Sequence, residues 1–318
     1  MKAKHTLAGA LALAMLASTA VSFQVSAADT AVTLKGAKVE AEAGGEFSVD
    51  VSLEDIPSTK VNVMDFAVTY DQTVLNVDSV KIGKSAAVDV SGDSTASDAP
   101  VFATNIKDGE ITVSWTTALD SNSWISEDGV ILTITGTVKD GVADGTVTPI
   151  DFAPVTRETY DGSGKNNSSM VIGYVYGGDS ATYTINAEAG SVTIGSKQTT
   201  TETTVTTTEG GKDTTATEAT TTATESKTDV TKATTTISGN IVTGTVAPGS
   251  VLYGDVNCDG TIDILDAVLL QKYLNGSVQL NYTQLANSDC QKDSQLDITD
   301  VTVLMQYLLR SFTSLPVA

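Results

Sequence analysis

An acidic segment near the carboxyl terminus occurs twice, and this repeat restricts the fold of that region more than any other feature. The stretch DVNCDGTIDILDAVLLQKYL at 255–274 aligns without gaps with DCQKDSQLDITDVTVLMQYL at 289–308. All four aspartates of the first copy recur in the second, followed by a similar apolar helical pattern. Because carboxylates this close together repel one another, each copy needs a cation among them or solvent around them. The repeat predicts two loop–helix units.

The spacing of the oxygen-bearing residues matches a calcium-binding loop of the EF-hand type. Such a loop supplies ligands from positions 1, 3, 5, 7, 9 and 12, with a backbone carbonyl at position 7 and a sharp turn at position 6. Gly260 at position 6 tolerates a positive φ, whereas Ser294 in the second loop would cost ~1 kcal/mol there. We therefore expect Ca²⁺ in both loops, bound more weakly in the second. The expected ligands are Asp255, Asn257, Asp259, Thr261, Asp263 and Asp266, then Asp289, Gln291, Asp293, Gln295, Asp297 and Asp300.

An alternative interpretation is a solvated acidic turn that caps a helix, but the glycine, the register and the repetition all favour calcium. Two features separate these units from a complete EF-hand, which is helix, loop and helix. The stretch VAPGSVLYG before Asp255 contains proline and glycine and leaves no room for an entering helix. Position 12 also carries aspartate in place of glutamate.

The composition excludes several classes of function. The chain has 39 acidic and 18 basic residues among 318, a formal net charge of −21, which argues against nucleic acid or anionic lipid as partners. Its only histidine, His5, lies in residues 1–28, which resemble a secretory signal with two early lysines, a short apolar core and VSA at the end. The mature chain, expected to start near Ala28 or Asp29, then lacks a histidine for a catalytic triad or a metal site.

The two cysteines, Cys258 and Cys290, are an even number in a chain that we expect to be secreted, which permits a disulfide between them. They occupy positions 4 and 2 of their loops, which are not ligand positions. Two thiols alone cannot build a structural zinc site. The sequence leaves the bonded and the free state open.

Residues 29–195 carry the alternating pattern of short β-strands. In FSVDVSL, VMDFAVTY and ITVSW every second residue is apolar, and DGE, EDG and KDG mark turns between such stretches. This pattern predicts a β-sandwich. Residues 196–248 are rich in threonine and contain no aromatic residue, which predicts a disordered linker. The loop–helix units then fill 249–318.

Residues 249–318 resemble a dockerin, the calcium-dependent docking module of cellulosomes, which has two loop–helix repeats with aspartate at position 12. Residues 29–195 resemble its partner module, a cohesin, in VTLKGAKVEAEAGGEFSVDVSLEDIPSTKVNVMDFAVTYDQTVLNVDSV, ISEDGVILTITGTVKDG and AEAGSVTI. The resemblance implies a mainly β fold, a nine-stranded jelly-roll β-sandwich, followed by a small all-α calcium-binding domain.

The resemblance also implies a function without catalysis, that of an adaptor scaffoldin. The cohesin would capture the dockerin of an enzyme or another subunit, and the chain's own dockerin would bind a cohesin of another scaffoldin. No LPxTG-like signal is present in the final stretch SFTSLPVA, so we expect any attachment of the secreted protein to the cell surface to go through the dockerin. We further expect the two modules of this chain not to bind each other, because self-capture would be wasteful.

The resemblance points to residues that contact partners. In cohesins an outward-facing strand aspartate helps to bind the dockerin, and Asp65 matches it; the alternative is a solvated strand aspartate. In dockerins, loop positions 10 and 11 and the following helix contact the cohesin. The matching residues are Ile264, Leu265, Gln271 and Lys272 in the first copy and Ile298, Thr299, Met305 and Gln306 in the second. Because Leu265 and Lys272 differ from Thr299 and Gln306, a symmetric two-way docking mode is not expected.

Two other functions compete with the adaptor. A secreted glycosidase would use paired carboxylates, but some pair always lies close among 39 acidic residues, so proximity has little value. A carbohydrate-binding module on the β-sandwich would need exposed aromatic side chains, and the sandwich offers only Trp115, Trp124 and some tyrosines. Fold alone cannot decide between sugar binding and dockerin capture.

Overall fold

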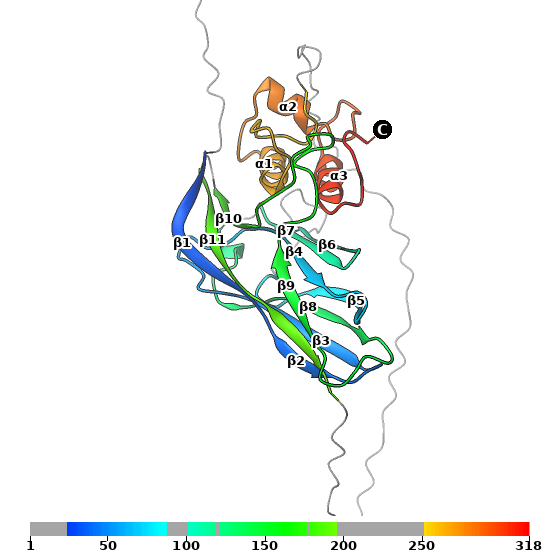
Figure 1. The fold of residues 1–318 in the computed structure, drawn as a ribbon. Coiled ribbons are helices and arrows are strands. Elements are labelled where there is room, and N and C mark those ends of the chain that lie inside the picture. The colour runs from blue at the N-terminus through cyan, green and yellow to red at the C-terminus, as the bar shows by residue number, and fades with distance from the viewer. Residues whose placement is uncertain (1–23, 88–100, 119–120, 177–178, 196–250, 318) are drawn as a thin grey trace, which may run out of the picture.

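The computed structural model describes residues 24–87, 101–118, 121–176, 179–195 and 251–317. They form a β-rich part, here called the sandwich, followed by a helical part at 251–317 (Figure 1). The expected linker lies outside the described residues, and so does the expected signal peptide except for 24–28, which begin the first strand. No helix in the described ranges is long and apolar enough to span a membrane.

The described residues contain twelve strands, three α-helices and one short 3₁₀ helix. The strands are β1 (Gln24–Gly36), β2 (Lys38–Ala41), β3 (Glu46–Glu54), β4 (Val63–Tyr70), β5 (Leu75–Ile82), β6 (Val101–Lys107), β7 (Glu110–Thr116), β8 (Gly129–Val138), β9 (Val147–Ala153), β10 (Val171–Tyr176), β11 (Asp179–Glu188) and β12 (Gly190–Ile194). The helices are η1 (Ser121–Ser123), α1 (Ile264–Leu274), α2 (Tyr282–Ser288) and α3 (Ile298–Leu308).

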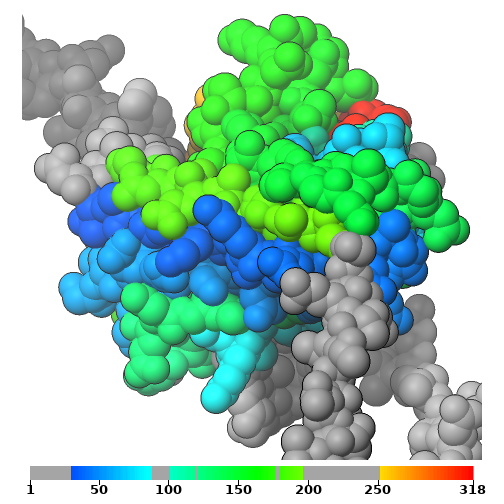
Figure 2. Space-filling model, turned by 60° about the horizontal axis from the view of Figure 1, so that its bottom comes forward, coloured from blue at the N-terminus to red at the C-terminus, as the bar shows by residue number. Residues whose placement is uncertain are grey.

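The strands form two layers that are joined along one side. One layer has the order β11–β1–β3–β8–β5, and the other has β6–β7–β4–β9–β12–β2. β10 pairs with both β11 and β4 and so connects the layers. Figure 2 shows the blue amino-terminal segment beside the yellow-green segment, in agreement with the parallel pairs β1–β11 and β2–β12. The expected β-sandwich is confirmed.

Two segments cross from one layer to the other, which accounts for two of the three strands beyond the nine that we expected. Only Ala37 separates β1 from β2, and only Ala189 separates β11 from β12. Where the two crossings meet, a Cβ added to Gly36 would lie 2.5 Å from the Gly190 nitrogen, so glycine is required by the close approach. Each crossing segment counts as two strands, because its hydrogen-bonding partner changes at the crossing.

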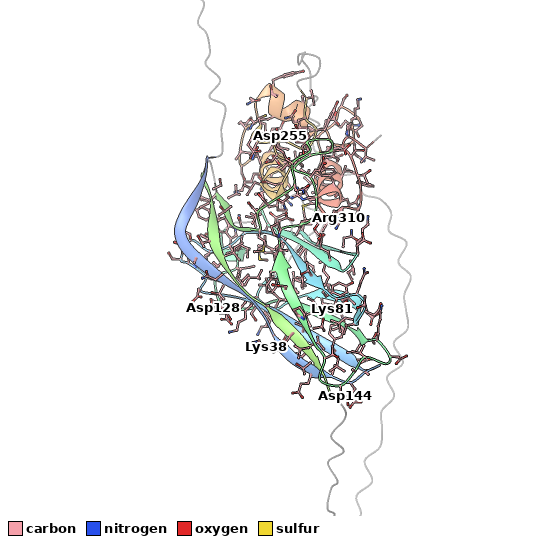
Figure 3. All side chains as sticks on the ribbon, in the orientation of Figure 1. Lys38, Lys81, Asp128, Asp144, Asp255 and Arg310 are labelled. Carbon is pink, nitrogen blue, oxygen red and sulfur yellow. The ribbon has the colours of Figure 1, made fainter. Side chains whose placement is uncertain are left out.

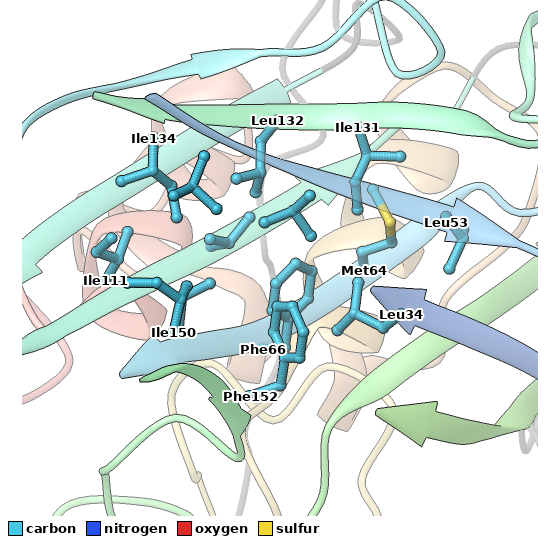
Figure 4. Close-up of a cluster of buried hydrophobic side chains, with 14 of the residues drawn as sticks. Leu34, Leu53, Met64, Phe66, Ile111, Ile131, Leu132, Ile134, Ile150 and Phe152 are labelled. Atoms are coloured by element: carbon cyan, nitrogen blue, oxygen red, sulfur yellow. The ribbon is translucent and has the colours of Figure 1, made fainter. Parts of the chain in front are cut away.

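The core lies between the two layers (Figure 4). Leu53, Leu132 and Ile134 from one layer meet Phe66 and Ile111 from the other, all almost fully buried. β3 has the expected alternation, with its apolar residues inward and its polar residues exposed. β4 instead has buried residues on both faces from Val63 to Val68, so something covers its outer face.

The helical part covers that outer face. α1 packs against β4, β10 and β7, at the end of the sandwich where β6 and β7 also lie (Figure 1). Arg310 lies at the boundary between the two parts, whereas Asp255 lies within the helical part away from the strands (Figure 3). α1 and α3 pack against each other, and each directly follows one of the acidic loops, as the repeat predicts.

Candidate functional site

Each acidic loop folds around two of its own carboxylates. Asp255 accepts hydrogen bonds from the amides at loop positions 5 and 6 at 3.0 and 3.1 Å, and Asp266 accepts from those at positions 3 and 9 at 2.9 and 2.8 Å. In the second loop Asp289 accepts from the same positions at 3.0 and 3.0 Å, and Asp300 at 3.2 and 3.1 Å. The two loops therefore share one backbone conformation despite their different sequences.

The turn at position 6 has a positive φ in both loops. Gly260 has φ 87°, and Ser294 has φ 65°. A side chain in this left-handed region costs on the order of 1–2 kcal/mol, so the second loop carries a strain that the first avoids. Position 6 thus takes a left-handed conformation in both loops, and weaker calcium binding by the second loop stays a prediction.

The aspartates at position 9 cap the helices. Asp263 accepts a hydrogen bond from the Leu265 amide at 2.8 Å, and Asp297 accepts one from the Thr299 amide at 2.7 Å. In each unit the position-12 aspartate completes a capping box with the cap residue's own amide. Helix capping and a loop built for a cation therefore use the same residues, and neither interpretation excludes the other.

The loops concentrate negative charge in buried surroundings. Burial raises the pKa of Asp255 to about 6 and that of Asp300 to about 7. Burial also raises the pKa of Asp263 to about 6, and burial together with the Asp263 charge raises the pKa of Asp266 well above its ordinary value. Ionised carboxylates here are poorly solvated and repel one another, so a bound cation would relieve both costs.

The residue types fit Ca²⁺, although the loops alone do not form a complete metal cluster. Among the described residues, no three acidic, cysteine or histidine side chains are gathered closely enough to hold a metal. Calcium also accepts amide and backbone carbonyl oxygens, which positions 3 and 7 supply here. The buried carboxylates with raised pKa values are the observation that supports a cation, and the twelve ligands named from the sequence remain predictions.

Cys258 and Cys290 are free thiols, so the disulfide that the even count permitted does not form. Cys258 is exposed in the first loop, whereas Cys290 is fully buried in the helical core, so the two side chains lie in different surroundings. Burial raises the pKa of Cys258 to about 11 and raises that of Cys290 as well, which makes both poor nucleophiles.

The outer face of β4 and its neighbours forms a continuous surface under the helical part, here called the docking face. The strand register aligns Val171 of β10, Asp65 of β4, Ser114 of β7 and Ala103 of β6 in one row across the sheet. Val63 of β4 lies two residues along on the same face. The row combines small apolar side chains with one carboxylate, which suits close packing around a single polar contact.

Apolar side chains of the docking face merge with the helical core. Val63, Val171 and Val175 belong to the same buried cluster as Leu265 and Val268 of α1. Val63 and Val268 are both 0 % exposed. Partly buried Val101, Ala103 and Tyr160 pack against this cluster from the sandwich side. The two parts thus share one hydrophobic cluster.

A buried ion pair lies at the centre of the docking face. Arg157 follows β9 and donates to the Asp65 carboxylate at 3.0 Å and to the Ile262 carbonyl of the first loop at 2.7 Å. The side chains of Arg157 and Asp65 are only 8 % and 1 % exposed. Asp65 also accepts from the Ser114 hydroxyl at 2.7 Å. The Ile262 amide donates to the Thr159 carbonyl at 2.8 Å, so the first loop contacts the sandwich through backbone and side chain together.

Further contacts lie at the far end of α3 and along α1. Arg310 pairs with Glu110 of β7 at 3.1 Å and approaches Asp108 at 3.9 Å. Asn105 of β6 donates to the Leu309 carbonyl at 2.7 Å. The Lys272 ammonium of α1 lies 5.5 Å from the centre of the Tyr176 ring. These contacts span the whole docking face from β10 to β6.

The predicted contact residues of the two copies differ in burial. In the first copy Ile264, Leu265, Gln271 and Lys272 are all buried, whereas in the second Ile298 and Thr299 are exposed, Gln306 is partly buried and Met305 is buried. Asp65 lies on the outer face of β4, as alternation predicts, but it is covered by Arg157 and the helical part. The expectation that the two modules avoid each other is wrong for this structure, because α1 packs on the docking face in one shared hydrophobic cluster and both arginines make polar contacts between the two parts.

Arg157 and Arg310 are the contact residues that sequence reasoning missed. They are the only arginines in the chain, and both reach across this contact, Arg157 to the Ile262 carbonyl and Arg310 to the Glu110 carboxylate. The planar guanidinium group suits buried pairing better than lysine does. The sequence feature that could have identified these contact residues is the rarity of arginine in a chain whose other long basic side chains are all lysines.

Solved cohesin structures resemble the sandwich. The seventh type I cohesin of ScaB from Pseudobacteroides cellulosolvens is 21 % identical, covering 51 % of this chain and 91 % of that chain with a TM-score of 0.39. The sixth cohesin of scaffoldin B from Acetivibrio cellulolyticus, in complex with a mutant dockerin, is 21 % identical, covering 52 % and 99 % with a TM-score of 0.40. A type I cohesin–dockerin complex from Clostridium thermocellum is 22 % identical, covering 52 % and 99 % with a TM-score of 0.38.

Family models assign both parts of the chain. No curated protein matches the sequence. The cohesin domain model matches residues 32–175, which include the docking face, and the dockerin type I domain model matches residues 253–309, which include both loops. Both are non-catalytic interaction domains, and the chain accordingly contains a member of the cohesin domain family followed by a member of the type I dockerin domain family.

Proposed function

We propose that this protein is a secreted, non-catalytic adaptor scaffoldin of a cellulosome that supports polysaccharide degradation. The observation that carries the proposal is the presence of a cohesin domain and a type I dockerin domain in one chain. The cohesin captures a dockerin-bearing enzyme or subunit, and the dockerin attaches the chain to a cohesin of another scaffoldin. We divide the chain into a signal peptide at 1–28, a cohesin at 29–195, a linker at 196–248 and a dockerin at 249–318.

The docking face supplies the surface for dockerin capture. Its small apolar residues surround the Asp65 carboxylate, which Arg157 and Ser114 hold in place. A dockerin helix that offers leucine and valine at its first turn fits such a surface, as α1 does within this chain. Asp65 therefore acts as the central polar contact of the cohesin.

Calcium holds the dockerin loops in their folded form. Ca²⁺ would supply the positive charge that the crowded carboxylates lack, because it binds oxygen ligands in flexible geometry. Asp255, Asp259 and Asp266 would carry most of the charge in the first loop, and Asp289, Asp293 and Asp300 in the second. The loops then fix the first turns of α1 and α3, which present the contact residues.

Sugar binding by the cohesin part receives no support from its tryptophans. Trp115 is 0 % exposed and Trp124 is 6 % exposed, so neither offers an open face to a sugar ring. Exposed aromatic rings are what a flat sugar-binding platform requires.

The test is capture by an immobilised panel of type I cohesins and type I dockerins. The full chain should be retained by at least one cohesin and at least one dockerin in Ca²⁺. EDTA should abolish both interactions, because each requires a folded dockerin on one side. A chain carrying Leu265→Asp is the matched control, since it should lose the cohesin partners and keep the dockerin partners. Absence of any retention by either class, for the native chain and the variant alike, would refute the adaptor.

A further inference from the structure

The docking face and α1, the two surfaces that the proposed function assigns to external partners, contact each other within this chain. We propose that the protein closes on itself, so that its own dockerin occupies its own cohesin and each external partner must open the chain before it binds. This inference rests on the proposed function for the identity of the external partners. It concerns the mutual affinity of the chain's own two domains, which can be measured without any external partner.

The apolar part of the contact is buried to the same degree as a domain core. Val63 on the docking face and Val268 on α1 are fully buried, and Leu265 is 6 % exposed. At the equivalent positions of the second repeat, Thr299 and Thr302 are exposed. The residues that change from apolar to polar between the repeats are thus those that the cohesin covers in the first repeat.

The polar part of the contact uses both arginines of the chain, one from each side. Arg157 of the cohesin reaches the Ile262 carbonyl of the dockerin, and Arg310 of the dockerin reaches Glu110 of the cohesin. Groups in such desolvated pairs are strongly destabilised when one partner is removed. The reciprocal placement of the only two guanidinium groups makes this contact specific in position and orientation.

Covalent connection favours closure within one chain over pairing between two copies. Residues 196–250 join the two domains and have a contour length of ~180 Å at about 3.3 Å per residue, ample to reach across one domain. A covalent linker long enough to span two sites generally gives an effective concentration on the order of 1 mM. At micromolar protein the domain on the same chain therefore competes about a thousandfold better than the same domain on a second copy.

Closure couples the two partners of the adaptor. An external dockerin that takes the docking face releases α1, and an external cohesin that takes α1 releases the docking face. Because binding linkage is reciprocal, each partner raises the apparent affinity for the other by the same factor. If the two domains bind each other with a dissociation constant of ~1 µM, closure weakens each partner ~1000-fold until the other is present.

Two full-chain variants, mixed together, test the closure. Ala103→Arg places a long cation in the docking face and leaves the dockerin intact, while Leu265→Asp damages α1 and leaves the cohesin intact. Each variant alone should be monomeric in Ca²⁺ by sedimentation velocity. An equimolar mixture should form a 1:1 heterodimer, because the intact cohesin of one chain accepts the intact dockerin of the other. The native chain should stay monomeric across micromolar concentrations.

The native chain should also protect the Ile262 amide from hydrogen exchange about 100-fold more than either variant does. Lys35→Glu is the matched control, since it breaks an exposed ion pair with Glu54 in the sandwich and should change neither readout. Should Ala103→Arg fail to fold, Glu110→Arg replaces it, because it breaks the ion pair with Arg310. Adding Arg310→Glu to that chain reverses both charges and should restore protection of the Ile262 amide.

Two results would overturn the closure. A mixture that remains monomeric, together with equal Ile262 exchange in native and variant chains, means that the contact does not exist in solution. Concentration-dependent chains of the native protein mean that the contact forms between copies. Retention of the native chain by the cohesin and dockerin panel in either case leaves the adaptor intact, whereas heterodimers without panel binding refute the adaptor and keep the closure.

Discussion

The two loop–helix repeats have the same backbone and differ in what covers them. In both loops, carboxylates at equivalent positions accept hydrogen bonds from backbone amides at equivalent positions. Both helices also begin with the same kind of capping box. Every residue of α1 from Ile264 to Tyr273 is buried, whereas α3 keeps Ile298, Thr299 and Thr302 exposed. Because intrinsic geometry is shared, the difference in burial comes from the cohesin that packs on α1.

The sequence of each repeat follows this difference in burial. Positions that maintain the loop and the inner helix face are the same or similar in both copies, such as Leu270 and Leu304. Positions that meet the docking face diverge, with Leu265 and Lys272 in the first copy against Thr299 and Gln306 in the second. A duplicated unit thus retains what folds it and varies what it binds, so that one copy carries the partner surface.

The largest expected effect comes from placing a charge at the second position of each helix. Leu265→Asp buries a carboxylate against Val63 without a partner, which should weaken the contact by at least ~3 kcal/mol, or more than 100-fold. Thr299→Asp places the same carboxylate in solvent and should change the contact less than twofold. Hydrogen exchange at the Ile262 amide, which donates to Thr159 across the contact, measures both variants.

The two substitutions are matched, because aspartate in the first turn of a helix interacts favourably with the helix dipole in either copy. Circular dichroism should therefore report equal helix content for both variants. Equal loss of Ile262 protection in the two variants would mean that the repeats are equivalent in binding and that the covered surface in this structure is not decisive.

A smaller effect, on the order of 2 kcal/mol after allowance for solvent screening, is expected from pH when calcium is removed. The raised pKa values of Asp255, Asp263 and Asp300 mean that the folded dockerin binds protons more tightly than the unfolded chain. In chelator its stability should be greatest near pH 4 and fall as the pH rises through 6 to 7. In excess Ca²⁺ the slope should reverse, because ligands must be ionised to bind. Thermal unfolding at a series of pH values measures both slopes.

Position-12 variants compare the repeats in the same experiment. Asp266→Asn should flatten the metal-free profile more than Asp300→Asn does, because Asp266 is fully buried beside the charge of Asp263. Profiles of equal slope with and without Ca²⁺ would contradict a role for these carboxylates in calcium binding.

Much of the fold could be predicted because local patterns determine it. The alternation in β3 predicts its buried residues correctly, and the repeat predicts α1 and α3. α2 was missed because it is only seven residues long, although Asn281 and Gln284 form a capping box that marks its start. Alternation could not predict the burial of β4 on both faces, because a pattern shows which face is outward and not what packs on it.

In the candidate site, too, some residues could be located from the sequence and others could not. The spacing of the aspartates located both loops, since ligand positions follow one another along the chain. Arg157 and Arg310 could not be located in this way, because their carboxylate partners lie 92 and 200 residues away in the sequence. The outward face that Asp65 shares with Val63 and Ala67 was expected to meet an external partner or solvent, and only the three-dimensional structure identifies the helical part as its cover.

The smallest expected effect concerns Lys272 and its counterpart Gln306. Lys272 lies over the Tyr176 ring and is 4 % exposed, and burial lowers its pKa to about 8. A charged lysine gains on the order of 1 kcal/mol from the ring but loses solvation, so Lys272→Gln should change closure by no more than about fivefold near pH 7. Opening returns the lysine to its ordinary pKa, so closing releases a proton above pH ~8 and should strengthen as the pH rises from there.

The measurement is Ile262 amide protection between pH ~8 and ~9, well below the ordinary tyrosine pKa of about 10. Each value is compared with Lys272→Gln at the same pH, which removes the intrinsic pH dependence of hydrogen exchange. The ratio of native to variant protection should rise across this interval, whereas the ratio for Gln306→Lys should stay constant, because position 306 in the second repeat is only partly buried. A constant ratio for Lys272→Gln would mean that Lys272 stays hydrated in the closed chain, and the asymmetry between the repeats would then depend on Leu265 and Val268 alone.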